Sequence, residues 1–165
     1  MGVAIDRDAG VLAMDYPDCL REDFPRHVQL AVDDVECVLH TLNGRSFETL
    51  ERHSPGLIGF DWHTYLWCSI ARMVHAAAAL ERRGLTSGIL LDCGSYFGNY
   101  SMMFRQAGFT VDALDAYQSY GQAMASNVGL LAGNGVRVVD FEEAGYDLAG
   151  LPAGRYDIVF CGSVI

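Results

Sequence analysis

The sequence predicts an α/β fold built on a parallel β-sheet. In the second half of the chain, short apolar runs alternate with helical patterns, and three of those runs end in an aspartate. Strands that alternate with helices at this spacing are typical of parallel sheets with right-handed crossovers. The chain has 165 residues, of which 51% are hydrophobic and 19% charged, so it is long and apolar enough for the core of one compact domain.

The first part of the chain, residues 1–84, is expected to form an N-terminal helical extension. Helical spacing of apolar side chains predicts helices over residues 25–42, 47–52 and 62–83. Asp23 and Asp61 precede the two long helices and are suitable N-caps. Asn43-Gly44 follows the first long helix and favours its end. The stretch before the first helix shows no clear period, so we expect it to wrap the surface or fray.

Residues 85–165 are expected to form the sheet and its connecting helices. The apolar runs predict strands over residues 88–91, 109–114, 136–139 and 156–161, and the segments between them predict helices over 99–107 and 119–131. The first three strands are followed directly by Asp92, Asp115 and Asp140. These acids should meet at one edge of the sheet, because the carboxyl ends of parallel strands lie together.

Composition excludes several classes of function. All eleven basic residues are arginine, so chemistry that needs a Schiff-base lysine or a phosphate-loop lysine is excluded for this chain. The formal net charge is −10, which makes the chain a poor general binder of nucleic acid. We therefore expect no nucleic-acid partner.

Five cysteines, an odd number without a Cys-x-x-Cys pair, argue against a disulfide framework and against a zinc ribbon. Free thiols are typical of a reducing compartment. The amino-terminal residues lack the basic and apolar regions of a signal peptide, and no apolar run is long enough to span a membrane. The expected location is cytoplasmic, with no metal site and no membrane partner.

The turn after the first predicted strand contains Gly94 and Gly98. Such glycines permit a tight turn and the close approach of a ligand to the backbone, and the N–H groups at the start of the next helix can hold a carboxylate or phosphate. The spacing is Gly-x-x-x-Gly, whereas a dinucleotide fingerprint needs Gly-x-Gly-x-x-Gly. Tyr96 and Phe97 stand where a pyrophosphate would require bare backbone. Asp115, at the end of the second strand, could accept hydrogen bonds from both hydroxyls of a ribose.

Four segments in this order resemble the motifs of the class I S-adenosylmethionine-dependent methyltransferases. LLDCGSYFGNYS resembles their first motif, VDALDAY the acidic motif of the second strand, VRVVDF the third-strand segment and YDIVFCGSVI the fourth-strand motif. The resemblance covers about residues 88–165. Many members of the family have a further glycine at the position of Tyr96. Tyr100-Ser101 after the second glycine is similar to the FkbM-type branch, which is associated with O-methylation.

The resemblance implies a cofactor, S-adenosyl-L-methionine, and a set of residues that bind it. Gly94 and Gly98 would line the methionine end, and Asp92 would support its amino group. Asp115 would hold the ribose hydroxyls and Asp140 would face the adenine amino group. The full set of implied cofactor-binding residues is Asp92, Gly94, Ser95, Tyr96, Gly98, Asp115, Ala116, Asp140 and Phe141.

The resemblance also implies a Rossmann-like sheet with strand order 3-2-1-4, helices on both faces and the helical extension before it. The family sheet has seven strands, and this chain shows four, so the Rossmann-like domain of residues 85–165 is expected to be incomplete. The fourth strand would then form an apolar edge. We expect a further C-terminal segment, a second copy of the chain in a homo-oligomer, or the N-terminal helices to cover it.

The expected function is methyl transfer to a small-molecule or saccharide acceptor, at oxygen. His63 is the candidate general base, although a single histidine is more often a surface or core residue. Trp62, Tyr65 and Trp67 are interpreted as a packing stripe rather than a substrate cage. Two alternatives remain open: a non-catalytic S-adenosylmethionine-binding module, and a nicotinamide-dependent enzyme, against which the missing dinucleotide fingerprint argues.

Overall fold

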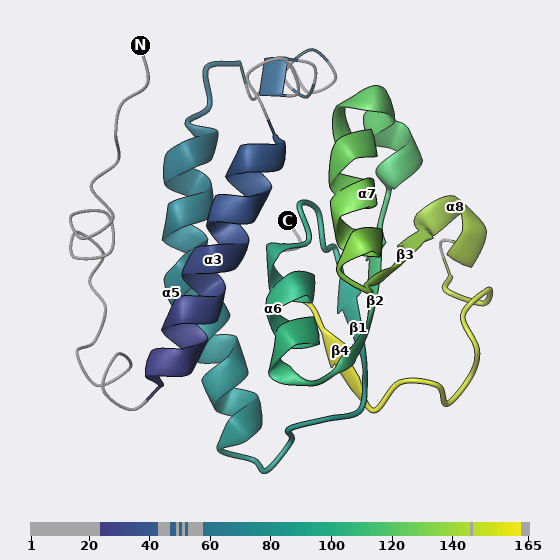
Figure 1. Ribbon diagram of the computed structural model, residues 1–165. Coiled ribbons are helices and arrows are strands. Elements are labelled where there is room, and N and C mark those ends of the chain that lie inside the picture. Colours follow the sequence, from purple (N-terminus) through teal and green to yellow (C-terminus); the bar gives the residue numbers. More distant parts are fainter. Residues whose placement is uncertain are drawn as a thin grey trace.

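The protein has an α/β fold in which four parallel strands form one sheet (Figure 1). The computed structural model describes residues 24–42, 47, 48, 50, 52, 58–145 and 147–162. The strands lie in the order β3-β2-β1-β4, which confirms the predicted fold class and strand order. The chain passes from β1 to β2 and β3 on one side, and then crosses back to place β4 on the other side of β1.

The strands fall close to the predicted segments. Their bounds are β1 Ile89–Cys93, β2 Thr110–Asp115, β3 Arg137–Asp140 and β4 Ile158–Phe160. The fourth strand is shorter than predicted, since residues 156, 157 and 161 lie outside it. Asp157, just before β4, is bonded to β1 through both its backbone and its side chain: its N–H donates to the Ile89 carbonyl at 2.9 Å, and its carboxylate accepts the Ile89 N–H at 2.8 Å.

Two long helices precede the sheet, α3 (Pro25–Thr41) and α5 (Trp62–Glu81). Asp61 caps α5 as predicted, since its carboxylate accepts the N–H of Thr64 at 3.0 Å. Helix α3 has Phe24 at its N-cap position without a side-chain cap, and the predicted cap Asp23 and stop Asn43-Gly44 lie outside the described residues. The short helix predicted near residues 47–52 is consistent with the helical backbone of its four described residues.

The helix predicted over residues 119–131 is wrong in its first half. A 3₁₀ helix, η2 (Tyr117–Met124), follows β2, and α7 (Ala125–Gly133) begins only after it. Gly121 separates two short turns inside η2 with φ of 57° and ψ of −143°, a conformation that no helix contains. Helix α6 (Asn99–Ala107) has the predicted bounds and ends at Gly108. The four-residue helix α8 (Phe141–Ala144) was not predicted.

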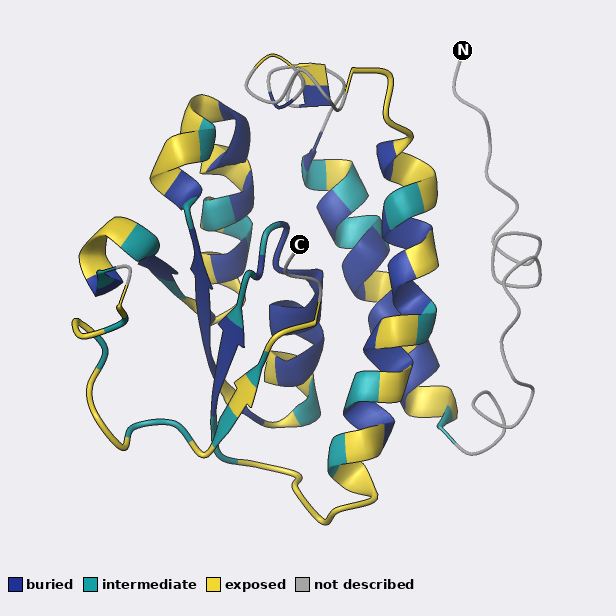
Figure 2. Ribbon diagram, turned by 180° about the vertical axis from the view of Figure 1, so that it is seen from behind, coloured by how far each residue is buried: buried dark blue, intermediate teal, exposed yellow. Residues whose placement is uncertain are grey.

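The two faces of the sheet are covered differently. Helices α6 and α7 pack on one face, and α3 packs on them with α5 beside it, so that helices and sheet share one hydrophobic core. A smaller apolar cluster lies on the other face, beneath α8 and residues 148–156. Figure 2 views this second face, where β4 carries Val159 with 62% of its surface exposed. The helical extension thus packs on the sheet through α6 and α7.

Candidate functional site

The turn between β1 and α6 is a left-handed, tightly bonded loop at the carboxyl edge of the sheet. Gly94 and Gly98 have φ of 75° and 74°, and Tyr96 between them has φ of 47°. The N–H groups of Gly94 and Ser95 both donate to the Leu114 carbonyl, at 2.9 and 3.2 Å, which fixes the turn on the end of β2. A non-glycine residue in this region costs about 1–2 kcal/mol, so the surrounding contacts must hold Tyr96 there.

Gly98 is needed for packing as well as for backbone conformation. A Cβ atom at this position would lie 2.4 Å from Cδ2 of Leu131, on α7. The close approach that the sequence analysis assigned to a ligand is therefore made, at this glycine, by the side chain of a neighbouring helix. Gly98 sets the distance between the start of α6 and α7.

Asp92 is buried at the end of β1, with 2% of its surface exposed. Its Oδ2 accepts a hydrogen bond from Ser101 Oγ at 2.6 Å. Burial raises the pKa of Asp92 to about 7, the hydrogen bond from Ser101 opposes this rise, and the nearby charge of Asp115 adds to it. The site thus contains a carboxyl group that can gain or lose a proton near neutral pH.

Asp115 joins the β1–α6 turn to η2. Its Oδ2 accepts the Tyr96 N–H at 2.6 Å, and its Oδ1 accepts the Ala116 N–H at 2.7 Å and the Tyr120 hydroxyl at 3.1 Å. The Tyr96 bond explains how the turn is held in its left-handed conformation. A carboxylate offers about four acceptor positions, and these three bonds leave one.

Asp140 lies beside Asp115 in the register of β2 and β3. It caps α8 by accepting the Glu142 N–H at 2.8 Å, and it accepts the Gln118 N–H at 2.7 Å. Both bonds are structural, and they orient the carboxylate along the edge that Asp115 occupies. Phe141 is half-buried and packs against the apolar cluster of the second face.

Tyr96 belongs to an aromatic cluster over the turn. Its ring lies 4.1 Å from that of Phe97, 5.3 Å from that of Tyr120 and 6.0 Å from that of Trp62. Trp62 is 5% exposed, so it packs in the core as predicted, and it brings the start of α5 to the β1–α6 turn. Burial raises the pKa of Tyr96, and this keeps its hydroxyl protonated. Tyr96 thus faces both the aromatic core and the carboxyl edge.

Ser95 is buried in the same turn. Its hydroxyl lies 2.7 Å from the Tyr117 hydroxyl and 3.3 Å from the Leu114 carbonyl. The sequence did not predict three hydroxyl partners of this site: Ser101, which donates to Asp92; Tyr117, which lies beside Ser95; and Tyr120, which donates to Asp115. The hydroxyl groups that follow the Gly-x-x-x-Gly turn and the second strand are the signal that could have found them.

His63 is not brought to the aspartates. It lies exposed in the first turn of α5, and its ring is 6.0 Å from that of Phe47. Among the described residues, His63 contacts neither Asp92, Asp115 nor Asp140. The role of His63 as a base stays a prediction from the sequence.

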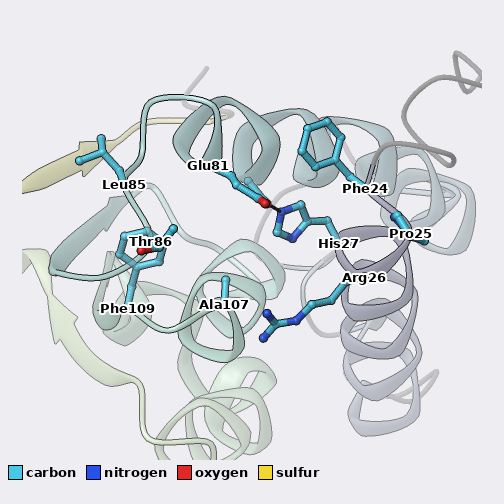
Figure 3. A pocket seen from close by; sticks show the side chains of 10 residues that line it. Phe24, Pro25, Arg26, His27, Glu81, Leu85, Thr86, Ala107 and Phe109 are labelled. Carbon is cyan, nitrogen blue, oxygen red and sulfur yellow. Dashed lines mark hydrogen bonds and ion pairs between the residues drawn. The ribbon is translucent and has the colours of Figure 1, made fainter.

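A cavity of about 190 Å³ lies at the opposite edge of the sheet (Figure 3). It opens between the start of α3 and the end of α5, and Thr86 and Phe109, which precede β1 and β2, form its floor. His27 and Glu81 are joined across its wall by a contact of 2.5 Å. This cavity is separate from the aspartates, which gather at the other ends of the strands.

Within the described ranges, no group of three or more metal-ligating side chains comes together. In the part of the chain that the structure describes, no helix combines the length and the apolar character that crossing a bilayer requires. Comparisons of the chain with protein-family models, with curated proteins and with solved structures gave no match.

Proposed function

We propose that the carboxyl edge of this sheet binds S-adenosyl-L-methionine and that the chain forms the cofactor-binding part of a methyltransferase. The observation that carries the proposal is Asp115, which lies beside the left-handed β1–α6 turn with one acceptor position left over. Its neighbour in the sheet is a second buried carboxylate, Asp140.

The topology supports a ligand at this place. The chain turns from β1 toward β2, and later from β3 back to β4, so the connections diverge at β1. In open α/β sheets, ligands bind outside the carboxyl ends of the strands at such a switch point. The Gly94–Gly98 turn follows β1 directly and lies at this point.

The hydrogen bonds of the turn discriminate between cofactors. Four of its five N–H groups are donated within the protein: those of Gly94 and Ser95 to Leu114, that of Tyr96 to Asp115 and that of Gly98 to Ser95. A dinucleotide pyrophosphate needs free N–H groups in this turn. S-adenosylmethionine carries no phosphate, so it is the better match, and the nicotinamide alternative is disfavoured.

The charges of the edge suit a sulfonium. Asp92 and Asp115 are carboxyl groups near the turn, and the rings of Tyr96 and Tyr120 lie above it. Carboxylates and aromatic faces both attract a cation. The first turn of α6, a nine-residue helix, lies at the positive end of the helix dipole, which favours the carboxylate of the methionine part.

The residues of this chain would bind and orient the cofactor. The bound group supplies an activated methyl for in-line displacement, and proximity is the main contribution that a protein makes to such a step. Asp115 would take a ribose hydroxyl, Asp140 the adenine amino group, and Asp92 the methionine amino group. The proposed acceptor is an oxygen of a small molecule or saccharide.

Calorimetric titration with S-adenosylhomocysteine tests the proposal, with NAD as the control ligand. We expect binding of S-adenosylhomocysteine only, and a loss of about 10-fold to 100-fold in affinity for Asp115→Asn, as for a hydrogen bond to a charged group. The matched variant is Asp33→Asn, which removes an exposed carboxylate on α3 that accepts a hydrogen bond from Gln29.

Thermal unfolding of both variants separates binding from folding. If folded wild-type protein fails to bind S-adenosylhomocysteine, or if Asp115→Asn and Asp33→Asn bind it equally, the assignment of this edge is wrong. Binding without product from any hydroxyl acceptor would favour the non-catalytic module instead.

A further inference from the structure

Two cysteines meet at the carboxyl edge, on the face of the sheet opposite to α6. Leu91 on β1 pairs with Val159 on β4, and both side chains point to this second face. Side chains alternate along a strand, so Cys93 and Cys161, two residues further on, return to the same face. Cys161 lies one residue past the last residue of β4, directly after the pair of Asp92 with Phe160.

The distance between the strands suits a disulfide. Neighbouring strands lie about 4.7–4.9 Å apart, and disulfides join Cα atoms about 4.4–6.8 Å apart. The two thiols also lie within hydrogen-bond reach of each other: burial, the nearby Cys161 thiol and a hydrogen bond with it raise the pKa of Cys93 to about 11. Both cysteines are free in the structure.

The other described cysteines do not share this arrangement. Cys37 lies on α3 and Cys68 on α5, both as free thiols, and Cys68 is exposed. Among the described cysteines neither has a cysteine neighbour, whereas Cys93 and Cys161 come from segments 68 residues apart that the sheet brings together. Cys68 is therefore a matched single thiol of similar exposure to Cys161.

We propose that Cys93 and Cys161 form a dithiol modification site, which a small disulfide such as glutathione disulfide oxidises to a bond between β1 and the residue after β4. The thiolate of the exposed Cys161 attacks one sulfur of the oxidant, forms a mixed disulfide and releases one thiol. Cys93 then gives up its proton and attacks the Cys161 sulfur, and the second thiol leaves. Two cysteine thiols are oxidised, and one small disulfide is reduced to two thiols.

The location gives the bond a structural consequence. Cys93 is the last residue of β1 and is followed directly by Gly94, where the left-handed turn begins. Strand β4 has three residues and pairs with β1 alone among the described strands. A disulfide here would fix the free end of β4 to the start of the turn. This inference stands on the register of the sheet and does not depend on the proposed cofactor.

Peptide mapping of the intact chain tests it. Cleavage after arginine places Cys93 in residues 84–105 and Cys161 in residues 156–165, and each of the five cysteines falls in a separate peptide. The folded protein is treated with glutathione disulfide, its remaining thiols are alkylated, and the peptides are analysed without reduction. We expect a linked pair of 84–105 with 156–165 and the loss of both free thiols, while Cys68 carries only glutathione or the alkyl group.

The proposal of a dithiol site is contradicted if Cys161 keeps its bound glutathione while Cys93 remains a free thiol. It is also contradicted if, after oxidation in urea, the same linked pair forms as readily as it does in the folded protein. Cys161→Ser should abolish the link, and Cys68→Ser should leave it unchanged. A second measurement uses only wild-type protein: a trivalent arsenical, which is held firmly by two neighbouring thiols, should protect both Cys93 and Cys161 from alkylation but not Cys68.

Discussion

The hydroxyl of Tyr120 donates a hydrogen bond to Oδ1 of Asp115 at 3.1 Å. Tyr120 belongs to η2, the segment that follows β2 directly, and its ring packs against Tyr96 in the β1–α6 turn. The tyrosine therefore occupies part of the acceptor capacity that the proposed ribose contact requires. A ribose hydroxyl of the cofactor would have to displace the Tyr120 hydroxyl or use the one acceptor position of Asp115 that the three hydrogen bonds leave open.

Replacement of Tyr120 by phenylalanine tests this competition. Tyr120→Phe keeps the ring and its packing but removes the donor, so an acceptor position of Asp115 becomes free. We expect S-adenosylhomocysteine to bind about 2-fold to 10-fold more tightly, which corresponds to one hydrogen bond of about 0.5–1.5 kcal/mol. Calorimetric titration measures the change.

A second tyrosine supplies the control. The Tyr156 hydroxyl donates to Asp112 at 2.8 Å, away from the turn. Tyr156→Phe removes the same kind of hydrogen bond and should leave the affinity unchanged. Weaker binding by Tyr120→Phe would instead mean that the hydroxyl contacts the ligand itself.

The sequence was sufficient to predict the sheet because its strands are short and the two central ones, β1 and β2, are largely buried. Buried parallel strands appear as apolar runs, and an aspartate at the end of three of the four runs marks the edge where the strands meet. Asp115 and Asp140 lie opposite each other in the register, as this reasoning requires. Their position, though not their use of hydrogen bonds, follows from the pattern alone.

The remaining features depend on contacts that no local pattern records. Gly121 interrupts the helical pattern after β2, and Tyr120, the residue before it, donates to Asp115 across five residues of the chain. Asp112 lies inside a strand, and its partners Arg137 and Arg155 come from 25 and 43 residues away. The sequence could not show that Gly98 packs against Leu131, because helix packing sets that distance.

The stability of the fold should fall as the pH rises toward 7, partly through Asp34. This residue of α3 is 1% exposed, and its Oδ1 accepts a hydrogen bond from Gln106 of α6 at 2.5 Å. Burial raises the pKa of Asp34 from 3.8 to about 7, with a contribution from the adjacent Asp33, and the Gln106 bond opposes it. The fold therefore favours the protonated form, and this contribution is complete below about pH 4 and lost as the pH passes 7.

Asp34→Asn should remove that part of the pH dependence. We compare the free energy of unfolding of Asp34→Asn with that of wild type at each pH. The difference should favour the variant by about 2–4 kcal/mol more at pH 7.5 than at pH 4. Urea unfolding at both pH values measures it, and Glu143→Gln, which changes an exposed carboxylate on α8, is the control. Free energies of unfolding of wild type and Asp34→Asn that change equally between the two pH values would contradict the prediction. Asp92, whose pKa is also raised to about 7, should keep a residual slope in the variant.

The ion cluster of Asp112 should stabilise β2 against β3 and the segment before β4. Asp112 is fully buried, and Arg137 donates two hydrogen bonds to it while Arg155 donates from the other segment. Burial alone would raise the pKa of Asp112, but the hydrogen bonds from Arg137, Arg155 and Tyr156 lower it to about 2. The carboxylate is therefore stable in the fold, and its contribution is lost only as the pH falls from about 4 through 2.

Arg137→Gln removes the two-point contact while Arg155 and Tyr156 remain. We expect a loss of about 1–3 kcal/mol in the free energy of unfolding at neutral pH, as for one lost partner of a buried charge. Arg83→Gln, at an exposed arginine just after α5, is the comparison and should change it by less than about 0.5 kcal/mol. Equal stability of the two variants would show that Arg155 and Tyr156 satisfy Asp112 without Arg137.

Two glycines within the same pair of packed helices should respond in opposite directions to alanine. Gly98 has φ of 74°, and an added Cβ would lie 2.4 Å from Leu131. Gly129 lies within α7, and an added Cβ there would meet nothing within 4 Å. Gly98→Ala should cost about 2–4 kcal/mol, since both the backbone and the packing resist it. Gly129→Ala should stabilise the protein by about 0.5–1 kcal/mol, because alanine is the better helix former.

Urea unfolding of the two variants gives both free energies in one experiment. Because Leu131 causes the clash, Leu131→Ala combined with Gly98→Ala should recover part of the packing cost while the backbone cost remains. The combined loss should then be smaller than the sum of the two single losses, as is usual for residues in contact. Strict additivity of the two changes would mean that backbone strain, and not the approach of α7, makes glycine necessary at the start of α6.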